Sequence, residues 1–345
     1  MHLNYAIGKR CFNLLMKKSN HMYPLDDSLK SALSSSWSPC FLRLFPAIDY
    51  PFGPFKSSKT KVQTLGSCNG LTCMIFNEKF ICIWNLSTKD HKKIPTLAVP
   101  IELSSTRSSV RYGFGYGCTT KDYKLLKIVG FSEYDDNGTY SRDGFKVDIY
   151  SLRSNSWRSI TNTPYYVKNI VSHERGIAGL LVNGALHWIV YLEMENRHVI
   201  ASFDIDDETF TELPKPKHFV EDEFRTTKVG LLGGYLCLLV GKCFSEGGGG
   251  DIWVMKNYEV IESWTLLFTI CAQQVPIFQH FSSFRPIKCF KHAILFQQND
   301  NILVSYDLNR KRARTIKVQG SRGKFSTEIY VGSLVSPSSF TLMSC

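Results

Sequence analysis

The sequence predicts an all-β fold, a β-propeller of four-stranded blades with little helix, and six blades are favoured over five. Three observations predict it. A strand, a polar turn and a second strand recur along the chain. The aromatic residues of the first strands are separated by 66, 53, 50 and 53 residues. A further strand pair, usually opened by glycine, precedes each copy, and four short strands in a unit of this length are typical of a propeller blade.

Each copy of the recurring hairpin places an aromatic residue in its first strand. In "VDIYSLRSNSWRSI", at 147–160, strand-like alternation ends at a polar turn and resumes at Trp157. Trp264 likewise follows the polar turn in the copy at 251–268. The five copies are at 81–95, 147–160, 200–214, 251–268 and 302–318, with the aromatic residues Trp84, Tyr150, Phe203, Trp253 and Tyr306. Five blades are therefore expected to end in such a hairpin.

The segments before these hairpins carry turn signals of their own. They are at 65–76, 112–131, 180–191, 230–241 and 284–298, with blade-motif residues Gly66, Asn69, Gly70, Gly113, Gly115, Gly184 and Trp188. Asn69-Gly70 and Asn183-Gly184 predict type I′ turns, because both central positions of such a turn need positive φ. Glycines in these segments would also let neighbouring blades approach closely.

The two ends of the chain are expected to complete the ring. The strand-like stretches at 40–46 and 328–337 have no hairpins of their own. They are expected to pair with each other or to form a composite sixth blade, which would remove an open sheet edge. We assign residues 1–38 to an N-terminal segment and residues 39–345 to the propeller.

Composition and charge narrow the class of protein. The chain has 345 residues, of which 43% are hydrophobic, and it contains no 18-residue apolar run and no signal-peptide core. We expect a cytoplasmic or nuclear protein without membrane contact. The net charge of +11 includes the basic runs 56–61 and 310–314, and "RKRAR" at 310–314 is compatible with a nuclear-import signal. Acidic clusters at 204–208 and 221–223 interrupt the positive field, so nucleic-acid binding is disfavoured.

Several stretches resemble catalytic features without completing one. "GFGYG" at 113–117 and "GGGG" at 247–250 lack the Lys-Ser/Thr of a phosphate-binding loop, which favours a turn or linker. His187 lies in an alternating strand and is interpreted as a structural histidine. The carboxylate groups at 135–136 and 206–208 lie in turn segments, where Asp bonds to nearby backbone. No catalytic residue is therefore assigned.

The eleven cysteines do not indicate a metal site. None forms a C-x-x-C pair, and no histidine pair has zinc-finger spacing. Cys68, Cys73, Cys237 and Cys243 fall inside apolar strand-like stretches, where free cysteine usually serves as a small buried hydrophobic residue. No metal, cofactor or enzymatic activity is expected.

Seven stretches in order resemble the F-box associated domain of plant F-box proteins, the kelch-like type. They are "GSCNGL" (66–71), "WNLSTKDHKKIP" (84–95), "YGFGY" with "KDYKLLKIV" (112–129), "VDIYSLRSNSWRSI", "NGALHWI" (183–189), "SFDIDDETFTELPKP" (202–216) and "DIWVMKNYEVIESWTLLF". The resemblance implies kelch-like blades that recruit a target protein to an SCF-type ubiquitin ligase. It also implies an F-box that binds the ligase adaptor.

The start of the sequence departs from the family pattern. No Leu-Pro-initiated helical F-box precedes the blades, and "MHLNYAIGKR" is similar to the segment just downstream of a family F-box. Residues 1–38 are thus interpreted as a remnant downstream of a missing F-box. Adaptor binding is expected only if an F-box is supplied upstream.

The leading hypothesis is a non-catalytic module that binds a target protein of unknown identity through its loops. The loops 132–145, 192–199 and 242–250 are the candidates, because loops carry function outside the packed sheets. The alternative is a propeller enzyme, a hydrolase or glycan-processing protein, with its active site in the central channel. Convergent carboxylates or histidines in that channel would favour the enzyme.

Overall fold

The structure is a computed structural model of the whole chain. The residues it describes are 12–18, 21–25, 41–42, 44–52, 61–95, 97, 108–134, 140–164, 166–167, 170, 178–192, 195–217, 224–242, 248–272, 275–278, 284–290, 293–299, 301–318 and 323–338. The chain divides into two compact units. Unit 1 is Met1–Lys61 with Lys215–Gly332, and unit 2 is Val62–Pro214 with Ser333–Cys345.

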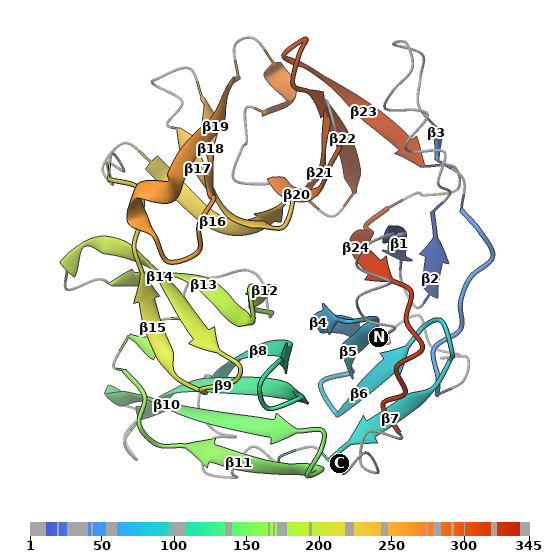
Figure 1. Cartoon of the computed structure of the whole chain (residues 1–345), viewed down its shortest axis with the longest axis vertical. Coiled ribbons are helices and arrows are strands. Elements are labelled where there is room, and N and C mark those ends of the chain that lie inside the picture. Colours follow the sequence, from blue (N-terminus) through green and yellow to red (C-terminus); the bar gives the residue numbers. More distant parts are fainter. Residues whose placement is uncertain are drawn as a thin grey trace. The chain divides into compact units, whose positions relative to one another are not determined.

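Unit 2 contains three antiparallel sheets of four strands, each in sequence order (Figure 1). The first sheet is β4 (Val62–Cys68), β5 (Leu71–Phe76), β6 (Phe80–Asn85) and β7 (His91–Ile94). The second is β8 (Ser108–Gly117), β9 (Asp122–Tyr134), β10 (Tyr140–Ser151) and β11 (Ser156–Ile160). The third is β12 (Leu180–Val182), β13 (Ala185–Leu192), β14 (Arg197–Asp204) and β15 (Phe210–Leu213). We call each sheet a blade.

Unit 1 contains the other three sheets formed by the described residues. One is β16 (Phe224–Leu232), β17 (Tyr235–Lys242), β18 (Gly249–Met255) and β19 (Trp264–Cys271). The next is β20 (Phe284–Cys289), β21 (Ala293–Gln298), β22 (Ile302–Asp307) and β23 (Arg312–Val318), extended by β3 (Phe41–Leu42). The third is β2 (His21–Pro24), β1 (Phe12–Lys18) and β24 (Ser326–Val331). The described residues also include the short 3-10 helices η4 (Ile261–Ser263) and η5 (Pro276–Phe278).

The all-β, six-bladed propeller class predicted from the sequence is confirmed. All five recurring hairpins and all five preceding strand pairs occur as antiparallel pairs. The Asn-Gly turns have the required geometry. The φ values are +50° and +82° at Asn69 and Gly70, and +50° and +80° at Asn183 and Gly184. Local turn chemistry therefore determines the register of these hairpins.

The chain ends pair differently from the prediction. The expected pairing of 40–46 with 328–337 is wrong, because β24 pairs with β1 and β3 pairs in parallel with β23. A composite sheet does form, since β1 and β2 come from the N-terminal part of the chain and β24 from the C-terminal part. Its N-terminal strands lie within residues 1–38, the segment that the sequence analysis placed outside the propeller.

The prediction that "GFGYG" forms a turn or linker is also wrong, because these residues end strand β8. The glycines of this strand are explained by the close approach of a neighbouring blade, which the sequence also predicted. A Cβ atom at Gly113 would lie 2.4 Å from Leu186 Cδ1, and one at Gly115 would lie 2.9 Å from Leu181 Cδ1. Glycine therefore lets β8 pack directly against the blade β12–β15. In "GGGG", the described residues 248–250 form a bend and the start of β18.

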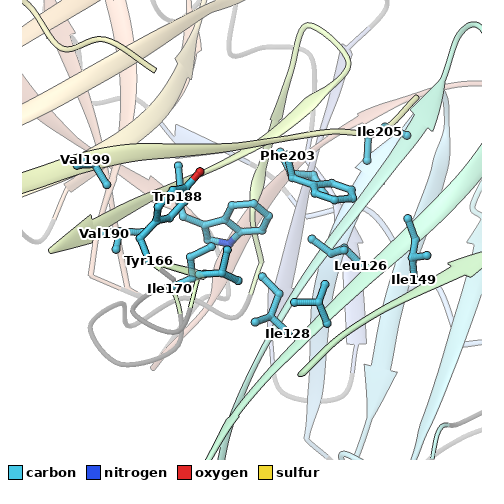
Figure 2. Close-up of a cluster of buried hydrophobic side chains, with 14 of the residues drawn as sticks. Leu126, Ile128, Ile149, Tyr166, Ile170, Trp188, Val190, Val199, Phe203 and Ile205 are labelled. Atoms are coloured by element: carbon cyan, nitrogen blue, oxygen red, sulfur yellow. The ribbon is translucent and has the colours of Figure 1, made fainter. Parts of the chain in front are cut away.

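The hydrophobic core of each unit lies between neighbouring blades. In unit 2, one cluster joins side chains of β8–β11 and β12–β15, and another joins β4–β7 and β8–β11. Figure 2 shows the indole of Trp188 in the first cluster, beside Tyr166, Ile170 and Ile128. Unit 1 has equivalent clusters between β16–β19 and β20–β23, and between β20–β23 and the sheet of β1 and β24. Packing of blade against blade supplies the apolar burial that a single sheet lacks.

Candidate interaction surface

The two ends of each four-stranded blade differ in their connections. The turns between the first and second strands and between the third and fourth strands lie at one end, which we call the turn end. The connection between the second and third strands lies at the opposite end, which we call the loop end. In the first blade of unit 2, residues 69–70 and 86–90 are at the turn end and residues 77–79 at the loop end.

An Asn or Asp side chain closes the last turn of three blades at the turn end. Asn85 Oδ1 accepts hydrogen bonds from the backbone N–H of Ser87 (2.8 Å) and Thr88 (3.3 Å). In the same way, Oδ1 of Asp204 and of Asp307 accepts hydrogen bonds from the backbone N–H groups two and three residues later, at 2.7 to 2.9 Å. Each follows the buried aromatic residue of its hairpin, as in "WN", "FD" and "YD". This repeated signal for an Asx turn was available in the sequence but was missed.

Polar groups at the turn end also join neighbouring blades of unit 2. Asp206 accepts hydrogen bonds from the backbone N–H groups of Thr119 (3.0 Å) and Thr120 (2.8 Å). Burial opposes ionisation of Asp206, but the hydrogen bonds from Thr120 and Thr119 outweigh it and lower its pKa. Lys124 Nζ donates to Ile205 O (2.7 Å) and lies 2.8 Å from Glu208 Oε1. These polar groups are thus engaged within the fold.

The loop end of the blade β12–β15 carries a network of charged side chains and a pair of aromatic rings. Arg197 is the centre of its charge network, with Nε 2.6 Å from Glu195 Oε2 and Nη1 2.6 Å from Glu212 Oε1. These hydrogen bonds, first that of Glu212, raise the pKa of Arg197. The three side chains are 37 to 39% exposed. They therefore hold one another in place and still face solvent.

Two aromatic rings lie at the same end of this blade, on the sheet face opposite to Arg197 and Glu212. The rings of Tyr191 and His198 are 4.9 Å apart, and Tyr191 Oη donates to Asn196 Oδ1 at 2.5 Å. We call Tyr191, Glu195, Asn196, Arg197, His198 and Glu212 the β13–β14 patch. Tyr and Arg are enriched among the residues that dominate protein–protein binding energy. The patch has the chemistry of a protein-binding surface.

The three loops predicted to bind the target all connect the second and third strands of a blade. Residues 132–145 join β9 to β10, residues 192–199 join β13 to β14, and residues 242–250 join β17 to β18. Each therefore lies at the loop end of its own blade. Residues 135–139, 193–194 and 243–247 are outside the described part of the chain. Target binding by these loops stays a prediction.

The blade-motif residues lie in strands and turns. Trp84, Tyr150, Trp188, Phe203, Tyr306 and Trp264 are buried, and Trp157 and Trp253 are partly buried. In β18 Trp253 is the one partly buried residue, and its neighbours Ile252 and Val254 are buried. A Cβ at Gly66 would lie 2.8 Å from Phe114 Cβ, which is a close approach of two blades. Trp157 Nε1 donates to Pro95 O at 2.6 Å.

Two of the cysteines considered above are buried, and two of the carboxylates lie outside the described residues. Cys73 and Cys237 are fully buried, and burial raises the pKa of both thiols. Asp135, Asp136 and Cys243 are outside the described residues. Among the described residues, no group of three or more His, Cys, Asp and Glu side chains is arranged to hold a metal ion. Within the same residues, no helix is long and apolar enough to cross a membrane.

His187 is a buried structural histidine, as its position in an alternating strand predicted. It is 1% exposed, and its Nδ1 lies 3.1 Å from Leu180 O. Burial lowers the pKa of His187 to about 4, although hydrogen bonds with the backbone of Leu180 and Ala185 oppose the shift. The imidazole is therefore neutral in the folded protein near pH 7.

We expect His187 to make folding stability fall in mild acid. Its folded-state pKa lies below the unfolded value of about 6.5, so unfolding takes up a proton between these pH values. The contribution is fully present above pH 6.5 and is lost as the pH falls to 4, a change on the order of 3 kcal/mol. Urea denaturation of the wild type and of His187→Gln at several pH values measures it. The prediction would be contradicted if the free energy of unfolding of the wild type changed no more with pH than that of the variant.

The comparison with known proteins identifies the family. A model of the F-box associated beta propeller domain matches residues 43–344. The chain belongs to this family. This F-box associated chain is 29% identical over 285 residues to F-box protein CPR1 of Arabidopsis thaliana, covering 79% of the chain and 68% of CPR1. It is 31% identical over 318 residues to F-box protein At3g07870 of Arabidopsis thaliana, covering 81% and 72%.

The resemblance seen in the sequence is thereby confirmed for the F-box associated chain. Similarity to solved structures is lower. YCF48 from Cyanidioschyzon merolae aligns over 88% of this chain and 84% of its own length, with 8% identity and a TM-score of 0.41.

Proposed function

We propose that this chain is a non-catalytic protein-interaction module that recognises a target protein for an SCF-type ubiquitin ligase. The observation that carries the proposal is the family match over residues 43–344, because the relatives with most of their length aligned are named F-box proteins. Fold alone would not assign this role, since propellers host many activities. We place the function in the cytoplasm or nucleus, where ubiquitin ligases work.

The target is proposed to bind at the loop ends of the blades. Two observations support this location. At the turn ends Asn85 is fully buried and Asp206 binds backbone N–H groups, whereas the side chains of the loop-end network around Arg197 are 37 to 39% exposed. The β13–β14 patch combines exposed charge with aromatic rings, and surface loops on a rigid scaffold are common binding elements.

Contact with the ligase adaptor is proposed to require an F-box. We expect the chain as printed to capture its target without the adaptor, and a fusion carrying an F-box before Met1 to capture both. Pull-down of the two versions side by side measures this. Equal adaptor recovery with both versions would place adaptor binding within the blades instead.

Substitution of the β13–β14 patch tests the binding surface. Tyr191→Ala combined with Arg197→Ala is expected to reduce target capture by about 10- to 100-fold, the effect typical of binding hot spots. The ring contact of Tyr191 and the ion pairs of Arg197 are partly exposed, so the fold should tolerate both substitutions. The measurement is quantitative mass spectrometry of proteins captured from plant extract by tagged variants with matched melting temperatures.

The matched control is Lys121→Ala, an exposed residue at the turn end of the neighbouring blade. It is expected to leave capture unchanged. If Lys121→Ala abolishes capture and the patch variant does not, the target binds at the turn end and the proposed location is wrong.

A further inference from the structure

A short segment that follows β24 is hydrogen-bonded to the first blade of unit 2. We call residues 333–338, "SLVSPS", the C-terminal clasp. Asn85 Nδ2 donates hydrogen bonds to Ser333 O (2.9 Å) and Val335 O (2.7 Å). The side chain of Val335 packs against the core cluster of blades β4–β7 and β8–β11. The clasp is thus held by one buried amide and one apolar contact.

A single carboxylate holds the other end of the clasp. Asp90 accepts hydrogen bonds from the hydroxyl groups of Ser336, through Oδ2, and Ser338, through Oδ1 at 2.9 Å. Burial opposes ionisation of Asp90, but these two hydroxyl groups, with nearby backbone N–H groups, lower its pKa. Both oxygens of the carboxylate therefore already have donors from the clasp.

The basic side chains nearest in sequence are Lys89, His91 and Lys92. The described structure shows no ion pair between any of them and Asp90. A change of charge on a clasp hydroxyl would consequently be felt first by the carboxylate that it contacts.

The sequence of the clasp adds a recognition signal. Ser336 is followed directly by Pro337, and Ser-Pro is the minimal sequence that proline-directed protein kinases accept. Pro337 is buried, Ser336 is partly buried and Ser338 is exposed. Residues 333–338 form no helix or strand, and segments outside the sheets open locally at lower free-energy cost than core strands do. Local opening would present Ser336 to a kinase.

We propose that Ser336 is a phosphorylation site and that its phosphorylation releases the C-terminal clasp from the first blade of unit 2. The γ-phosphoryl group of ATP is transferred to Ser336 Oγ, ADP leaves, and the hydroxyl proton passes to the kinase base. The hydroxyl that donated to Asp90 becomes a phosphate of about −1.5 to −2 charge with three acceptor oxygens. Repulsion from the ionised Asp90 then replaces a hydrogen bond.

The test uses the purified full chain, a proline-directed kinase and ATP, with mass spectrometry to locate the phosphate. Amide hydrogen exchange of residues 333–338 and of β7 reports release. Phosphorylation is expected to speed exchange there roughly tenfold or more, the change that corresponds to the loss of one or two hydrogen bonds. The readout needs no target, so its outcome is independent of the proposed function.

Three variants separate the causes. Pro337→Ala should block phosphorylation while keeping the hydroxyl, and Ser336→Ala should block it with the loss of one hydrogen bond. The Asp90→Asn variant should still be phosphorylated at Ser336. Its amide exchange should change much less on phosphorylation, because the carboxylate that repels the phosphate is gone. A free peptide covering the clasp shows whether the sequence itself is a substrate.

Failure of Ser336 to be modified, in the chain or in the peptide, would overturn the proposal. So would unchanged or slower exchange after modification, since slower exchange would mean that Lys89, His91 or Lys92 captures the phosphate and tightens the clasp.

Discussion

Replacing Asn85 by Asp is expected to destabilise the protein by about 3–5 kcal/mol at pH 7, the cost of an uncompensated buried charge. Asn85 is 0% exposed, and its amide group uses both of its ends. Oδ1 closes the turn to Ser87 and Thr88, and Nδ2 donates to two carbonyl oxygens of the C-terminal clasp. The substitution keeps the shape and the turn acceptor. It replaces two donors with a carboxylate oxygen facing Ser333 O and Val335 O.

The pH dependence of this effect identifies its cause. A buried carboxyl group beside two carbonyl oxygens has a raised pKa, and its protonated form can donate to one of them. The destabilisation by Asn85→Asp should therefore shrink as the pH falls from 7 towards 5. Urea denaturation of the wild type and the variant at both pH values measures the difference.

Asp204→Asn is the matched control, because it makes the reverse exchange at the corresponding turn of the blade β12–β15. The Asx turn to Asp206 and Asp207 keeps its acceptor, so a cost of about 1 kcal/mol or less is expected. If the two substitutions have equal effects, the amide of Asn85 does not hold the clasp.

The hairpins could be predicted from the sequence because their determinants are local. Asn69-Gly70 fixes a turn through the φ values of two adjacent residues, and the flanking alternation fixes which strands it joins. Strand β1 has no such local determinant. It pairs with β24 at the other end of the chain, for example Leu14 with Ile329. Nothing in a local pattern specifies a partner more than 300 residues away.

Glycine was ambiguous in the sequence for a physical reason. It suits positive φ in a turn, as at Gly70, and it also suits a strand that lies against bulky side chains, as at Gly113. Only the position of Leu186 in the next blade distinguishes the two uses. The same holds for Asn85 and Asp90, whose partners in the clasp are contributed by a distant segment. Residue type suggested a turn there, but only the fold brings the clasp to it.

Replacing Trp188 by Ala is expected to cost about 3–5 kcal/mol through the cavity that it leaves. Trp188 is 0% exposed and lies in the cluster between the blades β8–β11 and β12–β15 (Figure 2). Its Nε1 has no hydrogen-bond partner among the described residues. Trp188→Phe therefore loses volume but no hydrogen bond with those residues, and it should cost clearly less than Trp188→Ala. Equal costs would indicate that the indole N–H is bonded.

Gly179 provides an independent test of how tightly this indole is packed. A Cβ at Gly179 would lie 2.3 Å from Trp188 Cζ2, so Gly179→Ala should destabilise the wild type by overpacking, by about 1–3 kcal/mol. In the Trp188→Ala background the same methyl group enters the cavity, and its cost should vanish or change sign. A double-mutant cycle of unfolding free energies measures the coupling. Additive effects would mean that the two residues do not touch, and the large cost of Trp188→Ala would then need another origin.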